Sequence, residues 1–133
     1  MPADPHAPLI AGAGQRNRRP GDPEASPLEL IVRAARDASE RPGAGRLLER
    51  TESVRIVDCL SWPVPDPGAL VAEALGARPT ETVRTLTSGT GPLDLLADAC
   101  AEIQAGRLDV ALIAGAEAIV PFMRASREGR PTG

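Results

Sequence analysis

Aromatic residues, lysine, histidine and cysteine are scarce or missing in this chain of 133 residues. One Trp, one Phe and no Tyr provide too few stacking platforms for recognition of single-stranded nucleic acid. All fifteen basic residues are Arg, and eighteen acidic residues bring the net charge to −3. This balance gives no electrostatic basis for binding DNA or an anionic membrane, so we expect neither as a partner.

Long apolar runs are also missing. No stretch approaches the roughly 20 apolar residues of a membrane span. The N-terminus lacks the basic stretch and apolar segment of a secretory signal. The two cysteines, Cys59 and Cys100, are more typical of reduced thiols than of a disulfide framework, so we expect a cytoplasmic protein. With His6 as the sole histidine, the chain has too few ligands for a zinc site, and no metal is expected.

The apolar pattern alternates between short buried runs and helical periods. The length suits one domain with a real core. Such alternation predicts an α/β fold in which helices cover a mainly parallel sheet. Residues 1–8 are expected to be a disordered lead-in, residues 9–118 the domain, and residues 119–133, which show no clear period, a tail or the start of a missing insertion. Strands are predicted at 9–11, 54–57, 83–86 and 110–114, and helices at 26–41, 69–75 and 93–104.

The segment from Val83 to Ala118 concentrates the chemistry. A strand runs into a turn of small residues, and Pro92 then suits the start of a helix. A turn at this place delivers backbone N–H groups and a positive helix end to one point, which suits a nucleophile, an oxyanion or a phosphate. Three hydroxyl residues, Thr87, Ser88 and Thr90, are nucleophile candidates there. Turn and cap chemistry is the simpler interpretation, because a hydroxyl needs a positioned base.

The remaining nucleophile candidates are the two thiols. Cys100 lies in mid-helix on the predicted inward stripe, together with Leu96, Ala99 and Ile103, which favours a small buried thiol. Cys59 just follows a strand, a more plausible place for a nucleophile, but no base accompanies it and His6 belongs to the lead-in. Glu117 is either functional or a structural acid that accepts backbone N–H bonds.

Gly12-Ala13-Gly14 after a predicted strand suggests a dinucleotide-binding turn, but two features disagree with that motif. The third glycine position holds Asn17, and about a dozen loop residues precede the first helix. A phosphate-binding P-loop is excluded as well, because Gly91 is not followed by Lys-Ser or Lys-Thr.

Several of these segments together resemble the N-terminal half of a thiolase. The segments that support this resemblance are Leu86-Thr87-Ser88-Gly89, the helix to Ile103, the run from Ala105 to Val110, and Ala114-Gly115-Ala116-Glu117. Residues 9–15 and 58–62 add to a likeness that covers most of residues 9–118. It is strongest to the sterol-carrier-protein-type branch of acetyl-CoA acetyltransferases. The resemblance implies a three-layer α/β/α half-domain with strand order 3-2-1-4.

The resemblance also implies acyl transfer between coenzyme A thioesters, a reaction of lipid metabolism, with a coenzyme A thioester as substrate and no covalently bound cofactor. The family's nucleophilic Cys, at the start of the third helix, corresponds here to Gly89, and Ser88 is the neighbouring substitute. Two hypotheses stay open. The chain is an acetyltransferase polypeptide, truncated and lacking the nucleophilic Cys, or it is a non-catalytic thiolase-like subunit that binds acyl-CoA or a partner protein. In either case a homodimer or a thiolase-like partner subunit is expected.

Overall fold

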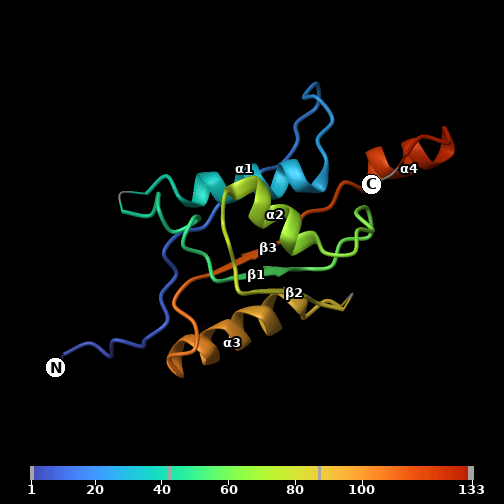
Figure 1. Ribbon diagram of the computed structural model, residues 1–133. Coiled ribbons are helices and arrows are strands. Elements are labelled where there is room, and N and C mark those ends of the chain that lie inside the picture. The colour runs from blue at the N-terminus through green and yellow to red at the C-terminus, as the bar shows by residue number, and fades with distance from the viewer. Residues whose placement is uncertain (1, 42, 87, 132–133) are drawn as a thin grey trace.

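The computed structural model describes residues 2–41, 43–86 and 88–131. It is a three-layer α/β/α arrangement, with α1 and α2 on one face of a sheet and α3 on the other (Figure 1). The elements in chain order are α1 Pro27–Ala38, β1 Ser53–Ile56, α2 Pro67–Leu75, β2 Glu81–Arg84, α3 Gly91–Gln104, β3 Ala111–Ala114 and α4 Ile119–Arg127.

The sheet is parallel, with β1 in its centre and the strand order β2-β1-β3. Ser53 lies opposite Glu81 of β2 on one side and opposite Ala111 of β3 on the other. The predicted α/β class, the parallel sheet and the placement of helices on both faces are therefore confirmed. The strand predicted at 83–86 begins two residues earlier, at Glu81.

The predicted strand order 3-2-1-4 is found only in part. The second and third predicted strands are neighbours, but the second also pairs directly with the fourth, so the first does not lie between them. Residues 9–11 form no strand, and Leu9 and Ile10 are 86% and 76% exposed. The reason lies in the next residues. A Cβ on Gly12 would be 2.0 Å from the Ala38 carbonyl oxygen, so this segment runs against the backbone of α1 and not within the sheet.

Helix boundaries follow the local signals in the sequence. Ser26 and Glu29 form a reciprocal capping box at the start of α1: the Glu29 N–H donates to Ser26 Oγ at 3.2 Å, and the Ser26 N–H donates to Glu29 Oε2 at 2.8 Å. Asp66 caps α2 by accepting the Ala69 N–H at 2.9 Å. Gly76 ends α2 in the left-handed region, with φ of +70°.

The two faces of β1 differ in character. Val54 and Ile56 belong to the apolar core that the sheet shares with α1 and α2. On the opposite face the Arg55 side chain is buried, and its guanidinium donates to Asp98 of α3, to Glu81 Oε1 at 3.0 Å and to Ser53 Oγ at 2.9 Å. The α3 layer is thus held to the sheet partly by buried charge. Other members of the apolar core are Ile31, Cys59, Trp62, Val71, Ala72 and Ala77.

Residues 119–133, for which the sequence predicted no regular element, contain the helix α4. It extends beyond the three layers at the end where the chain finishes (Figure 1). An ion pair between Arg124 and Glu24 ties it to the loop before α1, and none of its residues is fully buried. Within the described residues, none of the helices has the length and apolarity needed to cross a membrane.

Candidate functional site

The carboxyl ends of β1 and β3 meet the N-terminus of α3 at a hollow of ≈ 470 Å³. This is the edge at which open α/β sheets bind ligands. The walls are mostly apolar and carry two carboxylates. They are formed by Val57, Asp58, Pro92, Ile113, Ala114, Gly115, Ala116 and Glu117.

Glu117, which follows β3, fastens the loop that follows β1. Its carboxylate accepts the backbone N–H of Leu60 at 3.2 Å and of Ser61 at 3.1 Å, and its own neighbour Ala118 donates at 3.1 Å. Burial acts to raise the pKa of Glu117, but hydrogen bonds from Ser61, Cys59 and Leu60 outweigh it, and the pKa lies below its ordinary 4.5. The structural interpretation of Glu117 is therefore confirmed, since it is an ionised acceptor of backbone N–H groups.

Cys59 lies under the same loop and is buried. Its thiol donates to Glu117 Oε1 at 3.6 Å, and its sulfur is 3.2 Å from Ser61 Oγ. Burial raises the pKa of Cys59, and the negative charge of Glu117 adds to that rise against the opposing hydrogen bond with Ser61. Because only the thiolate is a strong nucleophile, Cys59 is in an environment that suppresses nucleophilic reactivity.

The turn that leads into α3 presents small exposed residues, and Pro92 just after it lines the hollow. Thr90, the N-cap residue, makes no cap bond with its side chain. Its hydroxyl donates to Asp94 Oδ2 at 2.9 Å and is 3.4 Å from Ser88 Oγ. Thr90 is thus at the N-cap position, but its hydroxyl bonds to a carboxylate and not to a backbone N–H, so the cap interaction predicted for it is not formed. Thr87, the third hydroxyl candidate, lies outside the described residues.

Gly89, which the resemblance predicts to be at the nucleophile position, lies in this turn with open space around it. A Cβ built on Gly89 has no atom within 4 Å among its surroundings, and its φ is not in the left-handed region. The backbone and the space would therefore accept a side chain here. The chemistry of the position is limited by the residue type and not by the fold.

Two sequence candidates lie away from this turn. The His6 ring approaches Gly106, at the carboxyl end of α3, where a glycine Cβ would be 3.5 Å from it. A helix of 14 residues is about 21 Å long, so His6 is too far from Ser88 to act as its base. Cys100 is half-buried on α3, more open than the buried thiol predicted from the sequence.

Asp58 and Thr85 belong to the site although the sequence did not single them out as a pair. The Asp58 N–H donates to Thr85 Oγ1 at 3.0 Å, and the Asp58 carboxylate is 3.8 Å from Arg84 Nε. The feature of the sequence that could have identified them is their position at the ends of two predicted parallel strands. In the part of the chain that the structure describes, no three His, Cys, Asp or Glu side chains gather closely enough to hold a metal ion.

Comparisons with known proteins agree with the fold. A monomeric SCP2-thiolase like protein type 1 from Mycobacterium smegmatis superimposes with a TM-score of 0.74 and 31% identity, over 86% of this chain and 24% of that one. 3-Oxoacyl-[acyl-carrier-protein] synthase III from Aquifex aeolicus VF5 gives 0.62 at 21% identity, over 74% of this chain and 32% of that one. No family model and no curated protein matches the sequence. The chain thus spans about a quarter to a third of the length of these structures.

Proposed function

We propose that this chain, a thiolase-like half-domain, is the part of an acyl-CoA-handling polypeptide that presents the α3 turn to the acyl group. Acyl transfer between coenzyme A thioesters is the reaction of the whole, and this chain does not run it alone. The observation that carries the proposal is Gly89. It lies in the turn that leads into α3, three residues before Pro92 of the hollow, and this turn has room for a nucleophile that the sequence does not provide.

The hollow favours the acyl or pantetheine arm of such a substrate over its phosphates. Val57, Pro92 and Ile113 offer apolar contact. Asp58 and Glu117 carry negative charge at the same edge, and like charges repel a phosphate group. We therefore expect the nucleotide end of coenzyme A to lie outside the hollow.

A second candidate function is that of a non-catalytic thiolase-like subunit that binds acyl-CoA or a partner protein. It is favoured by the surroundings of the other two nucleophile candidates, Ser88 and Cys59. Ser88 is exposed, and its described side-chain contact is another hydroxyl. Cys59 is buried with a raised pKa. Within the described residues Ser88 contacts no basic group, and the carboxylate beside Cys59, that of Glu117, is engaged with backbone N–H groups.

Acyl transfer and binding should be measured on the same purified chain. We expect no thiolysis of acetoacetyl-CoA, together with binding of acetyl-CoA by isothermal titration calorimetry. Ile113→Gln, in the hollow, should weaken that binding about threefold or more, because it removes apolar contact. Leu70→Gln, on α2 at the opposite face of the sheet, is the matched control. Absence of binding by the folded chain would contradict both functions.

Gly89→Cys tests the nucleophile position directly. We expect its thiol to react with iodoacetamide faster than Cys59 does, because a helix N-terminus favours thiolate and Cys59 is buried. Thiolysis should still be missing, since the one histidine of the chain, His6, lies at the other end of α3. Turnover by the wild-type chain that disappears in Ser88→Ala would overturn this assignment and make Ser88 the acyl carrier.

A further inference from the structure

Thr85 joins three segments of the candidate site. It directly follows β2 and is half-buried. Its backbone N–H donates to the Ile56 carbonyl of β1 at 3.1 Å, and its hydroxyl oxygen accepts the Asp58 N–H at 3.0 Å. The third segment is α3: a Cβ on Gly91, the first residue of that helix, would be 3.2 Å from Thr85 Oγ1 and 3.3 Å from Thr85 Cγ2. One side chain therefore binds the loop after β1 and packs against the start of α3.

The bond from Asp58 marks the place where the chain leaves the sheet. In a regular parallel ladder, the residue whose N–H donates to Ile56 would accept the Asp58 N–H with its own backbone carbonyl. Here the Thr85 hydroxyl accepts that N–H instead. Because a side chain continues the ladder, the backbone beyond Thr85 can turn away from β1 and back into α3 (Figure 1).

The same contacts hold both ends of the turn that carries Gly89. The turn begins after Thr85 and ends at Gly91, which is buried. Because Gly91 has no Cβ, the Thr85 side chain can lie directly against the start of the helix. Asp58, which Thr85 binds, and Pro92, which follows Gly91, both line the hollow. The position of the turn relative to the wall of the hollow therefore depends on Thr85.

We propose that Thr85 is a positioning residue of the acyl site, which sets the α3 turn against the wall of the hollow that Asp58 forms. The inference rests on the proposed function, because it gives Thr85 a part in binding the acyl thioester there. Thr85 acts through Asp58 and Gly91 and does not itself touch the substrate. A hydroxyl that only satisfied a backbone N–H would contribute to stability and would leave the turn where it is.

Two substitutions separate the hydroxyl of Thr85 from its methyl group. Thr85→Val keeps the shape and removes the acceptor of the Asp58 N–H, whereas Thr85→Ser keeps the acceptor. By isothermal titration calorimetry we expect Thr85→Val to weaken acetyl-CoA binding about fivefold, the effect of one ordinary hydrogen bond. Thr85→Ser should remain within about twofold of wild type, because its hydroxyl still holds Asp58. Circular dichroism and urea unfolding check that each variant is folded.

A thiol introduced by Gly89→Cys reports on the turn without any acyl-CoA. The pH dependence of its alkylation by iodoacetamide, resolved from Cys59 and Cys100 by peptide mass spectrometry, gives the apparent pKa of this thiol. A helix N-terminus lowers such a pKa, so adding Thr85→Val should raise it by about half a unit as the turn moves away from α3. Adding Thr85→Ser should leave it unchanged. A substitution that only lowered the stability of the fold would not shift it.

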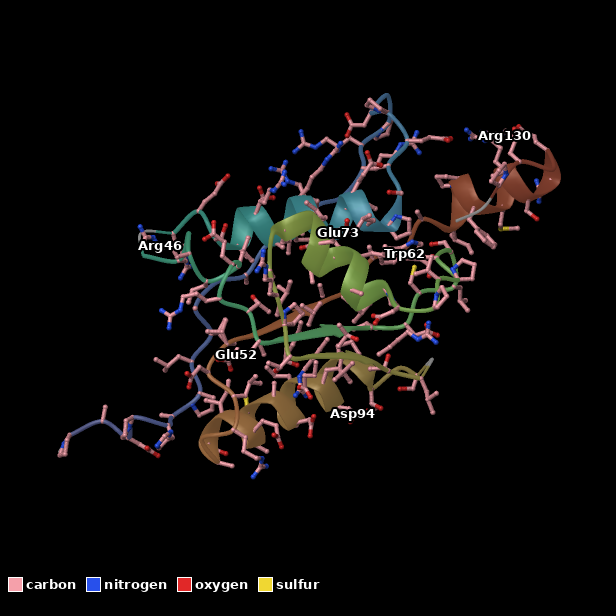
Figure 2. The ribbon with its side chains drawn as sticks, in the orientation of Figure 1. Arg46, Glu52, Trp62, Glu73, Asp94 and Arg130 are labelled. Atoms are coloured by element: carbon pink, nitrogen blue, oxygen red, sulfur yellow. The ribbon has the colours of Figure 1, made fainter. Side chains whose placement is uncertain are left out.

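Thr80→Val is the matched control, because it makes the same change just before β2. The Thr80 hydroxyl donates to the Glu52 carbonyl at 3.2 Å. Figure 2 shows Glu52 and Asp94, which lies in the first turn of α3, towards opposite ends of the sheet. Thr80→Val should therefore change neither acetyl-CoA binding nor the pKa of the introduced thiol.

The two readouts separate failure of this inference from failure of the proposed function. If wild type binds acetyl-CoA, and Thr85→Val alters neither the binding nor the thiol pKa, the inference is overturned and the proposed function stands. Equal losses in Thr80→Val and Thr85→Val would also overturn it. Absence of binding by the folded wild-type chain would overturn the proposed function and the acyl role of Thr85 together. The thiol measurement needs no acyl-CoA, so it still decides whether Thr85 fixes the turn.

Discussion

At the residue scale, two glycines have a role that their local motif does not suggest. Gly12-Ala13-Gly14 looks at first like part of a dinucleotide-binding turn, and Asn17 in the third position argues against it. The structure gives the glycines a packing role: a Cβ on Gly14 would be 2.1 Å from the Ala34 carbonyl oxygen of α1. The sequence could exclude the nucleotide site but could not identify the helix these glycines contact, because that contact spans about 20 residues of chain.

Gly12→Ala and Gly14→Ala should each destabilise the fold by about 1–3 kcal/mol, because the new methyl group collides with helix backbone that cannot move independently. Urea unfolding measures this loss. Gly45→Ala is the control, since a Cβ there has open space and the backbone is not left-handed. Equal stability of Gly12→Ala and Gly45→Ala would show that the N-terminal segment does not lie against α1.

Glu117 makes stability depend on pH with a definite sign. Its pKa is lower in the folded chain than its ordinary 4.5, so its contribution is present above that value and is lost as pH falls through the folded pKa. Glu117→Gln should therefore lower the free energy of unfolding by about 1 kcal/mol at pH 7. The difference from wild type should shrink as pH falls through the folded pKa, because the wild-type carboxyl is then protonated as well.

The pH dependence can be measured by urea unfolding. Urea midpoints of wild type and Glu117→Gln are compared at pH 7 and in acid. Glu24→Gln is the control, because the described contact of Glu24 is with Arg124 on α4 and not with the loop after β1. A deficit in Glu117→Gln that is as large in acid as at neutral pH would mean that the ionised carboxylate is not what holds the loop.

At the scale of elements, the sequence predicted where α3 lies but not which side faces inward. The predicted stripe was Leu96, Ala99, Cys100 and Ile103, whereas the buried residues are Gly91, Leu95 and Ala99. α3 carries apolar residues nearly all round, so periodicity alone cannot choose a face. The choice is made by Arg55, which a pattern search treats as a surface residue but which is buried and draws Asp98 towards the sheet.

Asp98→Ala should therefore destabilise the chain by about 1–3 kcal/mol, because it leaves the buried Arg55 guanidinium with Glu81 as its remaining carboxylate. Thermal or urea unfolding measures the change. Glu73→Ala, which removes an exposed acid from α2, is the control and should cost much less. An Asp98→Ala chain as stable as wild type would show that α3 is held by apolar packing alone.

At the scale of the whole molecule, the layered α/β fold follows from the alternation of strands and helices, but the strand order does not. Order depends on contacts between segments distant in sequence, here the pairing of β1 with β3. The same limit applies to the site. The α3 turn was predictable from its position after a strand, whereas the Glu117 contact with the loop at Leu60 and Ser61 joins residues 57 and 56 positions apart.

The two edge strands of the sheet, β2 and β3, differ in how well they are protected against pairing with another chain. β2 begins with Glu81 and ends with Arg84, and charged residues discourage pairing with another chain. β3 contains neither a charge nor a proline. The carbonyls of Val110 and Ala114 accept from the β1 side, so by alternation the polar groups of Ala111 and Ile113 point to the outer edge. We therefore expect β3 to pair with a second copy or with a complementary polypeptide, or to aggregate.

Ala111→Pro tests this edge, because it removes an outward N–H and leaves the bonds to β1 in place. The self-association of the wild-type chain is the reference for this test. We expect that association to fall in Ala111→Pro and to persist in Ala111→Ser, which keeps the N–H. Sedimentation velocity and the intermolecular β band of the infrared spectrum are the measurements. A single monomeric wild-type species with cooperative thermal unfolding would show that β3 is not open to other chains.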